Sequence, residues 1–140
     1  MPKCVMLCLA LLLPAVVAAR DHDPEPKPKA VTPREIVDDG LPGGRGNVES
    51  PTSISSETHL AELVPDKGVR AAILKQVDFR KERLLLFRWH GGGFDRLTPV
   101  EGKPGEAAFE FAAGDAKETC DQAKLFAVPA GAKVKVTVAQ

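Results

Sequence analysis

The sequence predicts an α+β fold in which an N-terminal helical pair packs on a small antiparallel β-sheet. Two observations support this prediction: apolar residues recur at helical spacing over 53–77, and alternating or continuous apolar runs extend from 84 to the C-terminus. The strongest run covers residues 84–89, Leu-Leu-Leu-Phe-Arg-Trp, and ends at the chain's one tryptophan. At a strand's period of two, its odd-numbered residues share one face and its even-numbered residues share the other. Because both faces are mostly apolar, we expect this strand at the centre of the sheet, between two layers.

The N-terminus has the features of an export signal. Lys3 supplies positive charge, an apolar stretch follows, and Val17-Ala18-Ala19 is a small-residue cleavage motif. The apolar stretch over 4–19 is shorter than the roughly 20 residues that a membrane-spanning helix needs. We therefore expect residues 1–19 to be a signal peptide that is cleaved after Ala19. The mature protein would be secreted or periplasmic and would have no membrane span.

Residues 20–30 predict a proline-rich, disordered tether, because their prolines alternate with charged residues. If cleavage follows Ala19, His22 becomes the third residue of the mature chain. A free amine, two amide nitrogens and an imidazole at this spacing can hold Cu(II) or Ni(II) in a square plane. The alternative is a disordered tail whose histidine has no ligand role. Mass spectrometry that located the cleavage at another bond would dispose of the metal hypothesis.

Residues 31–52 are expected to be mostly irregular. Thr32-Pro33-Arg34-Glu35 fits a helix capping box, whereas Ile36-Val37 before Asp-Asp-Gly would also suit a short edge strand. The glycines, prolines and polar residues of 38–52 then predict a surface loop.

Residues 53–140 are expected to form the α+β domain, which begins with the helical pair. Ser53 or Ser55 would cap a first helix with an apolar stripe, and Pro65 would end it. Asp66 would cap a second helix over 68–76. Helices this short are marginal alone, so we expect them to dock on the sheet.

The rest of the domain predicts strands and turns. Gly91-Gly92-Gly93 indicates a hairpin turn that leads into a strand over 94–100, which Pro99 confines to a sheet edge. Alternation predicts strands over 107–112 and 134–138, with a short apolar segment at 125–128 between them. The polar residues 113–122 predict a loop that contains Cys120.

These segments together resemble a group of short secreted proteins of planctomycete bacteria. The shared skeleton covers roughly residues 53–138 and consists of Val77-Asp78-Phe79, residues 84–89, Gly91-Gly92-Gly93, Asp95, Leu97 and residues 125–129. This resemblance implies export and a common fold but no particular activity. More distantly, the chain is similar to the C-terminal domain of the protease-complex subunit PrcB, which implies at most a protein-binding accessory module. It departs from that domain at the glycine turn, where Gly92 and Gly93 are followed by Phe94.

The candidate binding residues lie at the end of the central run. Arg88, Trp89, His90 and Phe94 would form an anchor patch for a partner if the sheet face is only partly covered there. The alternative is that Trp89 closes the core. His90 beside the glycines could also serve as a general base or metal ligand, although no second ligand has the required spacing.

Cys120 is the one cysteine that remains after the predicted cleavage. A nucleophilic cysteine needs a base and a positive environment, whereas the neighbours Glu118 and Asp121 are acidic and oppose the thiolate. An inert thiol is therefore the simpler interpretation, and one cysteine provides no internal disulfide.

Composition narrows the class of function. The chain has 19 basic and 19 acidic residues, so nothing indicates a nucleic-acid surface. We predict a non-enzymatic interaction or accessory module of the cell envelope, with another envelope protein as partner and no cofactor. The alternatives are a small exported enzyme that uses Cys120 or His90, and Cu(II) or Ni(II) binding through His22.

Overall fold

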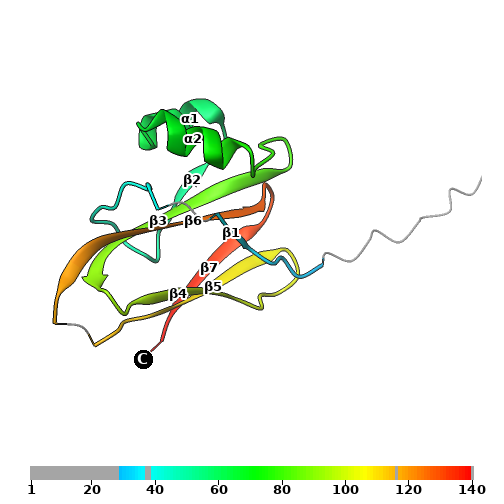
Figure 1. The fold of residues 1–140 in the computed structure, drawn as a ribbon. Coiled ribbons are helices and arrows are strands. Elements are labelled where there is room, and N and C mark those ends of the chain that lie inside the picture. Colours follow the sequence, from blue (N-terminus) through cyan, green and yellow to red (C-terminus); the bar gives the residue numbers. More distant parts are fainter. Residues whose placement is uncertain (1–28, 37–38, 116, 140) are drawn as a thin grey trace, which may run out of the picture.

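The computed structural model describes residues 29–36, 39–115 and 117–139. The predicted signal peptide, most of the tether and His22 lie outside the described residues. Within them, seven strands and two helices follow in the order β1 (Arg34–Ile36), β2 (Thr52–Ile54), α1 (Glu57–Leu63), α2 (Lys67–Leu74), β3 (Glu82–Gly92), β4 (Arg96–Val100), β5 (Glu106–Ala112), β6 (Thr119–Pro129) and β7 (Lys133–Val138). The strands form two stacked sheets, ordered β1-β6-β3-β2 and β4-β5-β7 (Figure 1).

The predicted fold class, a helical pair packed on one small antiparallel sheet, is wrong. The structure is mostly β and has two sheets, and the pairing of β5 with β7 is parallel. The helices have only seven and eight residues and do not form the expected helical layer. Periodicity identified most of the strands but not their partners, because the assignment of strands to sheets depends on contacts between distant residues. The hairpin predicted at the glycine triplet is also wrong, since Gly91 and Gly92 belong to β3 and β4 pairs with β5 in the other sheet.

The main core lies between the two sheets. Odd-numbered residues of β3 enter it, among them Phe87. The Phe87 ring packs against Phe109 of β5 and Phe126 of β6, with ring centroids 4.9 Å and 5.7 Å away. The even-numbered Leu84 and Leu86 belong to a second buried cluster on the other face of β3. The predicted division of this strand into two apolar faces is therefore confirmed.

The second cluster brings together short elements from the first half of the domain. Ile36 and Ile54 come from the edge strands β1 and β2, and Leu60 and Ile73 come from the helices. For residues 31–37 the strand alternative is correct. Strand β2 was not predicted, because a three-residue strand shows too little periodicity to be recognised.

β3 and β6 pair over their whole length, from Glu82 with Pro129 to Gly92 with Thr119. The loop predicted over 113–122 is therefore too long, and Cys120 lies in a strand. Polar residues continue β6 because the ends of both strands extend beyond the core.

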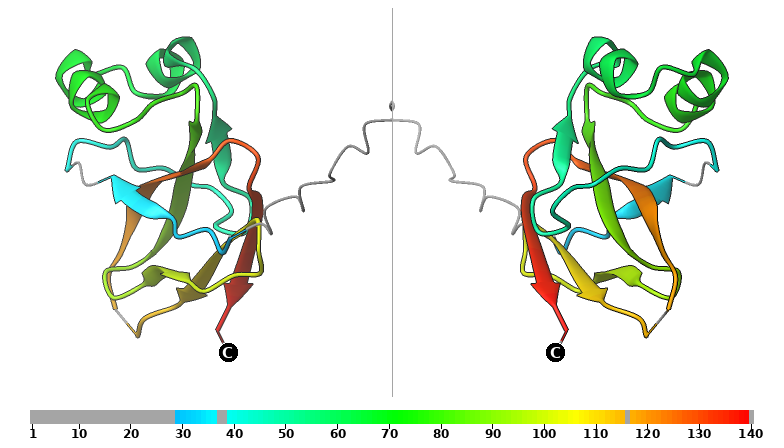
Figure 2. Two further views of the ribbon diagram at one scale, coloured as in Figure 1. Left: turned by 90° about the vertical axis from the view of Figure 1, so that its right-hand side faces the viewer. Right: turned by 90° about the vertical axis from the view of Figure 1, so that its left-hand side faces the viewer.

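The loop over 39–51 passes close to these two long strands. A Cβ added to Gly43 would come within 2.8 Å of the Asp121 carbonyl oxygen, and one added to Gly46 would come within 2.7 Å of the Arg88 carbonyl oxygen. Both positions therefore require glycine, because only a backbone without a side chain can lie this close to another. Figure 2 shows this cyan segment beside β3 and β6.

Side chains cap both helices. Ser56 accepts a hydrogen bond from His59 N, and Asp66 accepts hydrogen bonds from Gly68 N and Val69 N. The prediction for Asp66 is confirmed, whereas Ser53, predicted as a possible cap, lies in β2. The backbone N–H groups of Val69 and Gly68 lower the pKa of Asp66, because they stabilise its charged form.

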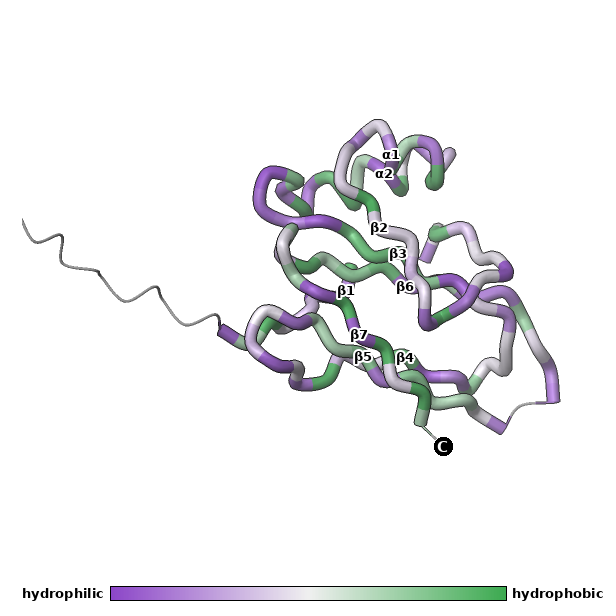
Figure 3. Tube along the Cα trace, turned by 180° about the vertical axis from the view of Figure 1, so that it is seen from behind, coloured by the Kyte–Doolittle hydropathy of each residue, from purple (hydrophilic) through white to green (hydrophobic). Residues whose placement is uncertain are grey.

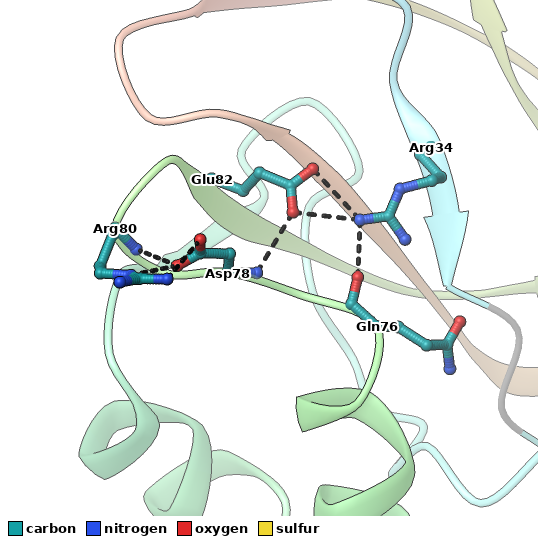
Figure 4. Close-up of polar contacts among 5 residues, drawn as sticks. All are labelled: Arg34, Gln76, Asp78, Arg80 and Glu82. Atoms are coloured by element: carbon teal, nitrogen blue, oxygen red, sulfur yellow. Dashed lines mark hydrogen bonds and ion pairs between the residues drawn. The ribbon is translucent and has the colours of Figure 1, made fainter.

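A polar cluster ties β1 to the segment that leads into β3 (Figure 4). Arg34 Nη2 donates to Gln76 O at 2.7 Å and to the Glu82 carboxylate at 3.1 Å. Glu82 also accepts from Asp78 N, while Asp78 pairs with Arg80 at 3.0 Å. The Arg80 side chain lowers the pKa of Asp78 because it stabilises the carboxylate. These contacts lie at the surface, so we assign them to positioning rather than to chemistry.

Hydropathy follows this architecture. Hydrophobic stretches coincide with the paired strands, and hydrophilic residues gather in several of the connections between them (Figure 3). In the described part of the chain, no helix is long and apolar enough to cross a membrane.

Candidate functional site

The structure separates the four predicted binding residues. Trp89 is only 4% exposed and lies between the sheets, where its ring meets Phe111 edge-on at 5.7 Å. Arg88 is half-buried on the opposite face of β3, and its Nη2 donates to Leu63 O at the end of α1 at 3.3 Å. His90 is exposed, and Phe94 is 70% exposed. The four side chains therefore do not form one patch.

Asp95 organises the end of the sandwich where β3 turns into β4. One carboxylate oxygen accepts from Trp89 Nε1 at 3.1 Å, and the other accepts from Gly114 N at 2.8 Å. Its own N–H donates to Gly92 O at 3.0 Å and closes the turn over residues 93–95, named here the β3–β4 turn. Asp95 thus connects β3, this turn and the segment that follows β5.

Phe94 is held at the tip of the β3–β4 turn. A Cβ added to Gly114 would overlap the Phe94 backbone, so the two segments are in direct contact. With Asp95 fixed on one side and Gly114 packed against its backbone, Phe94 has a well-defined position. Its ring nevertheless points away from the core, since it is the most exposed large apolar side chain among the described residues.

An open hollow of about 560 Å³ lies beside this turn. Its lining includes Trp89 and Phe111, the hydrogen-bonded Asp95, and several residues without a long side chain, among them Gly46, Ala113 and Gly114. These small residues leave space beside Trp89 and Phe111. A second surface depression, of about 470 Å³, is lined by Phe94 itself together with Asp115, Lys117 and Glu118.

His90 and Asp121 face each other across β3 and β6, with Nδ1 and Oδ1 2.6 Å apart. Such a carboxylate can orient an imidazole whose other nitrogen acts as a base. Cys120 pairs with Gly91 instead, and alternation along β6 places it on the opposite face from Asp121. The strand geometry therefore does not bring Cys120 and His90 together as a nucleophile and its base. Within the described ranges, no group of three His, Cys, Asp or Glu residues could hold a metal ion.

Sequence reasoning identified Phe94 but missed Asp95 and Gly114 as the residues that position it. Asp95 had a usable signal, because it follows the glycine triplet at the point where a strand resumes. Gly114 had none, since its contact with Phe94 spans 20 residues of sequence.

Comparisons with protein-family models, with curated proteins and with solved structures find no match to this chain. The likeness to planctomycete secreted proteins and to PrcB therefore stays a prediction. The skeleton on which it rests is largely structural in this fold, since Leu84, Phe87, Leu97 and residues 125–128 are buried and Asp95 bonds Trp89.

Proposed function

We propose that this protein is a non-enzymatic interaction module that binds a protein partner through the β3–β4 turn, with Phe94 as the anchor residue. The observation that supports this most directly is the 70% exposure of Phe94 on a turn fixed by Asp95 and Gly114. Burying such a ring in a partner contributes about 1.5–3 kcal/mol. Little of this is lost to ordering the turn, because its backbone is already held in place.

The neighbouring residues suit a protein interface. Asp115, Lys117 and Glu118 line the same depression as Phe94 and supply charges of both signs. An apolar centre inside a charged rim is the usual anatomy of a binding hot spot, because the rim excludes water and selects the partner.

The described part of the chain begins far from this surface, at Lys29. Gly105 N donates to Lys29 O at 3.2 Å, and Gly105 follows β4 at the end away from Phe94. Ala30 also forms an isolated bridge with Pro104, which lies in the β4–β5 connection. A domain held by its N-terminus would present Phe94 outward, which supports the proposal of an accessory module in the cell envelope.

The alternative of a small exported enzyme has less support. It would use Cys120 or His90, and the strands place these two residues on opposite faces, so His90 cannot serve as the base for the Cys120 thiol. The His90–Asp121 contact is also explained as an ordinary polar side-chain pair across two strands.

The test is affinity capture from envelope extract with wild-type protein and two variants as bait. Phe94→Ala removes the anchor, and Val100→Ala is the control, because Val100 is also exposed but lies at the other end of β4. We expect a saturable protein partner that binds wild type and Val100→Ala and is lost with Phe94→Ala. A partner retained equally by Phe94→Ala, or no partner for folded wild-type bait, contradicts the proposal.

A further inference from the structure

We propose that a second copy of this chain is the partner of Phe94, and that each Phe94 ring sits in the hollow above Trp89 and Phe111 of the other copy. This inference rests on the proposed function, because it assigns an occupant to the same turn. It also names the site that receives the Phe94 ring and gives the complex two-fold symmetry.

The ring and the hollow are immediate neighbours on one molecule. Asp95 follows Phe94 in sequence and lines the hollow, and Gly114 lines it while contacting the Phe94 backbone. A two-fold axis beside the β3–β4 turn would bring each ring over the other copy's hollow at once. Such an interface is closed and isologous, which is the commonest way in which identical chains associate.

The residues that line the hollow suit an aromatic ring. Trp89 and Phe111 both line it and meet edge-on, and glycines form much of the rest of its lining. An aromatic ring gains most against other aromatic rings in tilted or offset contact. The hollow is open to solvent and has a volume of about 560 Å³, which leaves room for a phenyl ring.

The glycines that create this space cannot acquire side chains in the present fold. A Cβ at Gly46 would meet the Arg88 carbonyl oxygen at 2.7 Å, and a Cβ at Gly114 would overlap the backbone of Phe94. The hollow is therefore a consequence of the local packing and is present before any partner arrives.

Charge does not oppose this association. The 19 acidic and 19 basic residues of the full sequence almost balance, with or without Lys3, so long-range repulsion between two copies is small. Asp115 and Glu118 lie with Lys117 beside Phe94, and a two-fold arrangement can set the lysine of one copy against the carboxylates of the other. The contact is confined to one turn and one hollow on each copy. We therefore expect a weak dimer, because stable interfaces bury more than about 1,200 Å².

The experiment is sedimentation equilibrium of the full chain, as recovered after expression and any processing. Protein concentrations up to about 1 mM allow a weak dimer to be detected. Phe94→Ala removes the ring. Ala113→Arg fills the hollow, because Ala113 is exposed and lines it. Val100→Ala is the matched control at the far end of β4. An unchanged Tm and Trp89 emission in the monomeric state would show that each variant is folded.

We expect wild type and Val100→Ala to dimerise with the same Kd, and each of the other two variants to weaken the dimer at least about tenfold, as for loss of a central anchor. Wild type that stays monomeric throughout overturns the inference, as does a dimer that survives either substitution. Neither result affects the proposed function, which fails only if Phe94→Ala leaves partner capture intact or if no partner is captured at all.

Discussion

The indole N–H of Trp89 donates to the Asp95 carboxylate at 3.1 Å, so the one tryptophan of this chain positions the β3–β4 turn from inside the core. The same carboxylate accepts from Gly114 N at 2.8 Å. Trp89 therefore supports the candidate surface without being part of its exposed area. The exposed aromatic residue is Phe94, one position before Asp95.

Replacing Asp95 with alanine should destabilise the fold. Trp89 Nε1 and Gly114 N would lose their acceptor in a partly buried place, which costs about 1–3 kcal/mol of unfolding free energy. Urea denaturation followed by Trp89 fluorescence measures the change. Asp115→Ala, at an exposed position nearby, is the control and should leave stability unchanged. Equal stability of the two variants would show that the Trp89–Asp95 bond contributes little.

Two glycines of the same triplet should respond differently to alanine. A Cβ at Gly91 would overlap the Asp95 carboxylate, whereas a Cβ at Gly93 meets nothing within 4 Å. We expect Gly91→Ala to lower the free energy of unfolding by about 1–3 kcal/mol, as for other overpacked sites. Gly93→Ala should stay within about 0.5 kcal/mol of wild type. Thermal unfolding of both variants checks this, and a reversed order would mean that the turn is placed differently.

Phe109 and Phe94 should separate stability from binding. Phe109 is fully buried, with ring centroids 4.9 Å from Phe87 and 5.0 Å from Phe126. Phe109→Ala should cost about 3–5 kcal/mol, because it opens a cavity between the sheets. Phe94→Ala should change stability by less than about 0.5 kcal/mol, since the ring is exposed. Denaturant titrations give both values, and a large loss for Phe94→Ala would place that ring inside the fold.

Acid should weaken the cap of α2. Backbone N–H groups lower the pKa of Asp66 from its usual 3.8, so the folded state binds this proton less readily than the unfolded state. The resulting stability is present above pH 3.8 and is lost as the pH falls through the lower, folded-state pKa. Asp66→Asn keeps a capping oxygen without the titration. Its Tm should therefore lie below that of wild type near neutral pH and converge with it in strong acid. A constant Tm difference at all pH values would contradict this cause.

The sequence was sufficient to predict those features that depend on residues close together in the chain. The two faces of β3 followed from its period of two, and the cap at Asp66 followed from a side chain that bonds N–H groups two and three residues ahead. Prediction from the sequence failed where a residue pairs with another that is distant in the chain. Cys120 was assigned to a loop because the neighbouring residues are polar, but pairing with Gly91 makes it part of β6.

The sequence by itself determined the strong strands, the cap of α2 and the presence of an aromatic residue at the glycine turn, because periodicity and turn chemistry act over a few residues. Only the tertiary structure decided that the strands divide into two sheets, that Trp89 is buried between them, and that Phe94 stays exposed beside a hollow. Those outcomes depend on pairings such as that of β3 with β6 and on the approach of Gly114 to Phe94. These contacts join residues that are far apart in the chain, so no local sequence pattern predicts them.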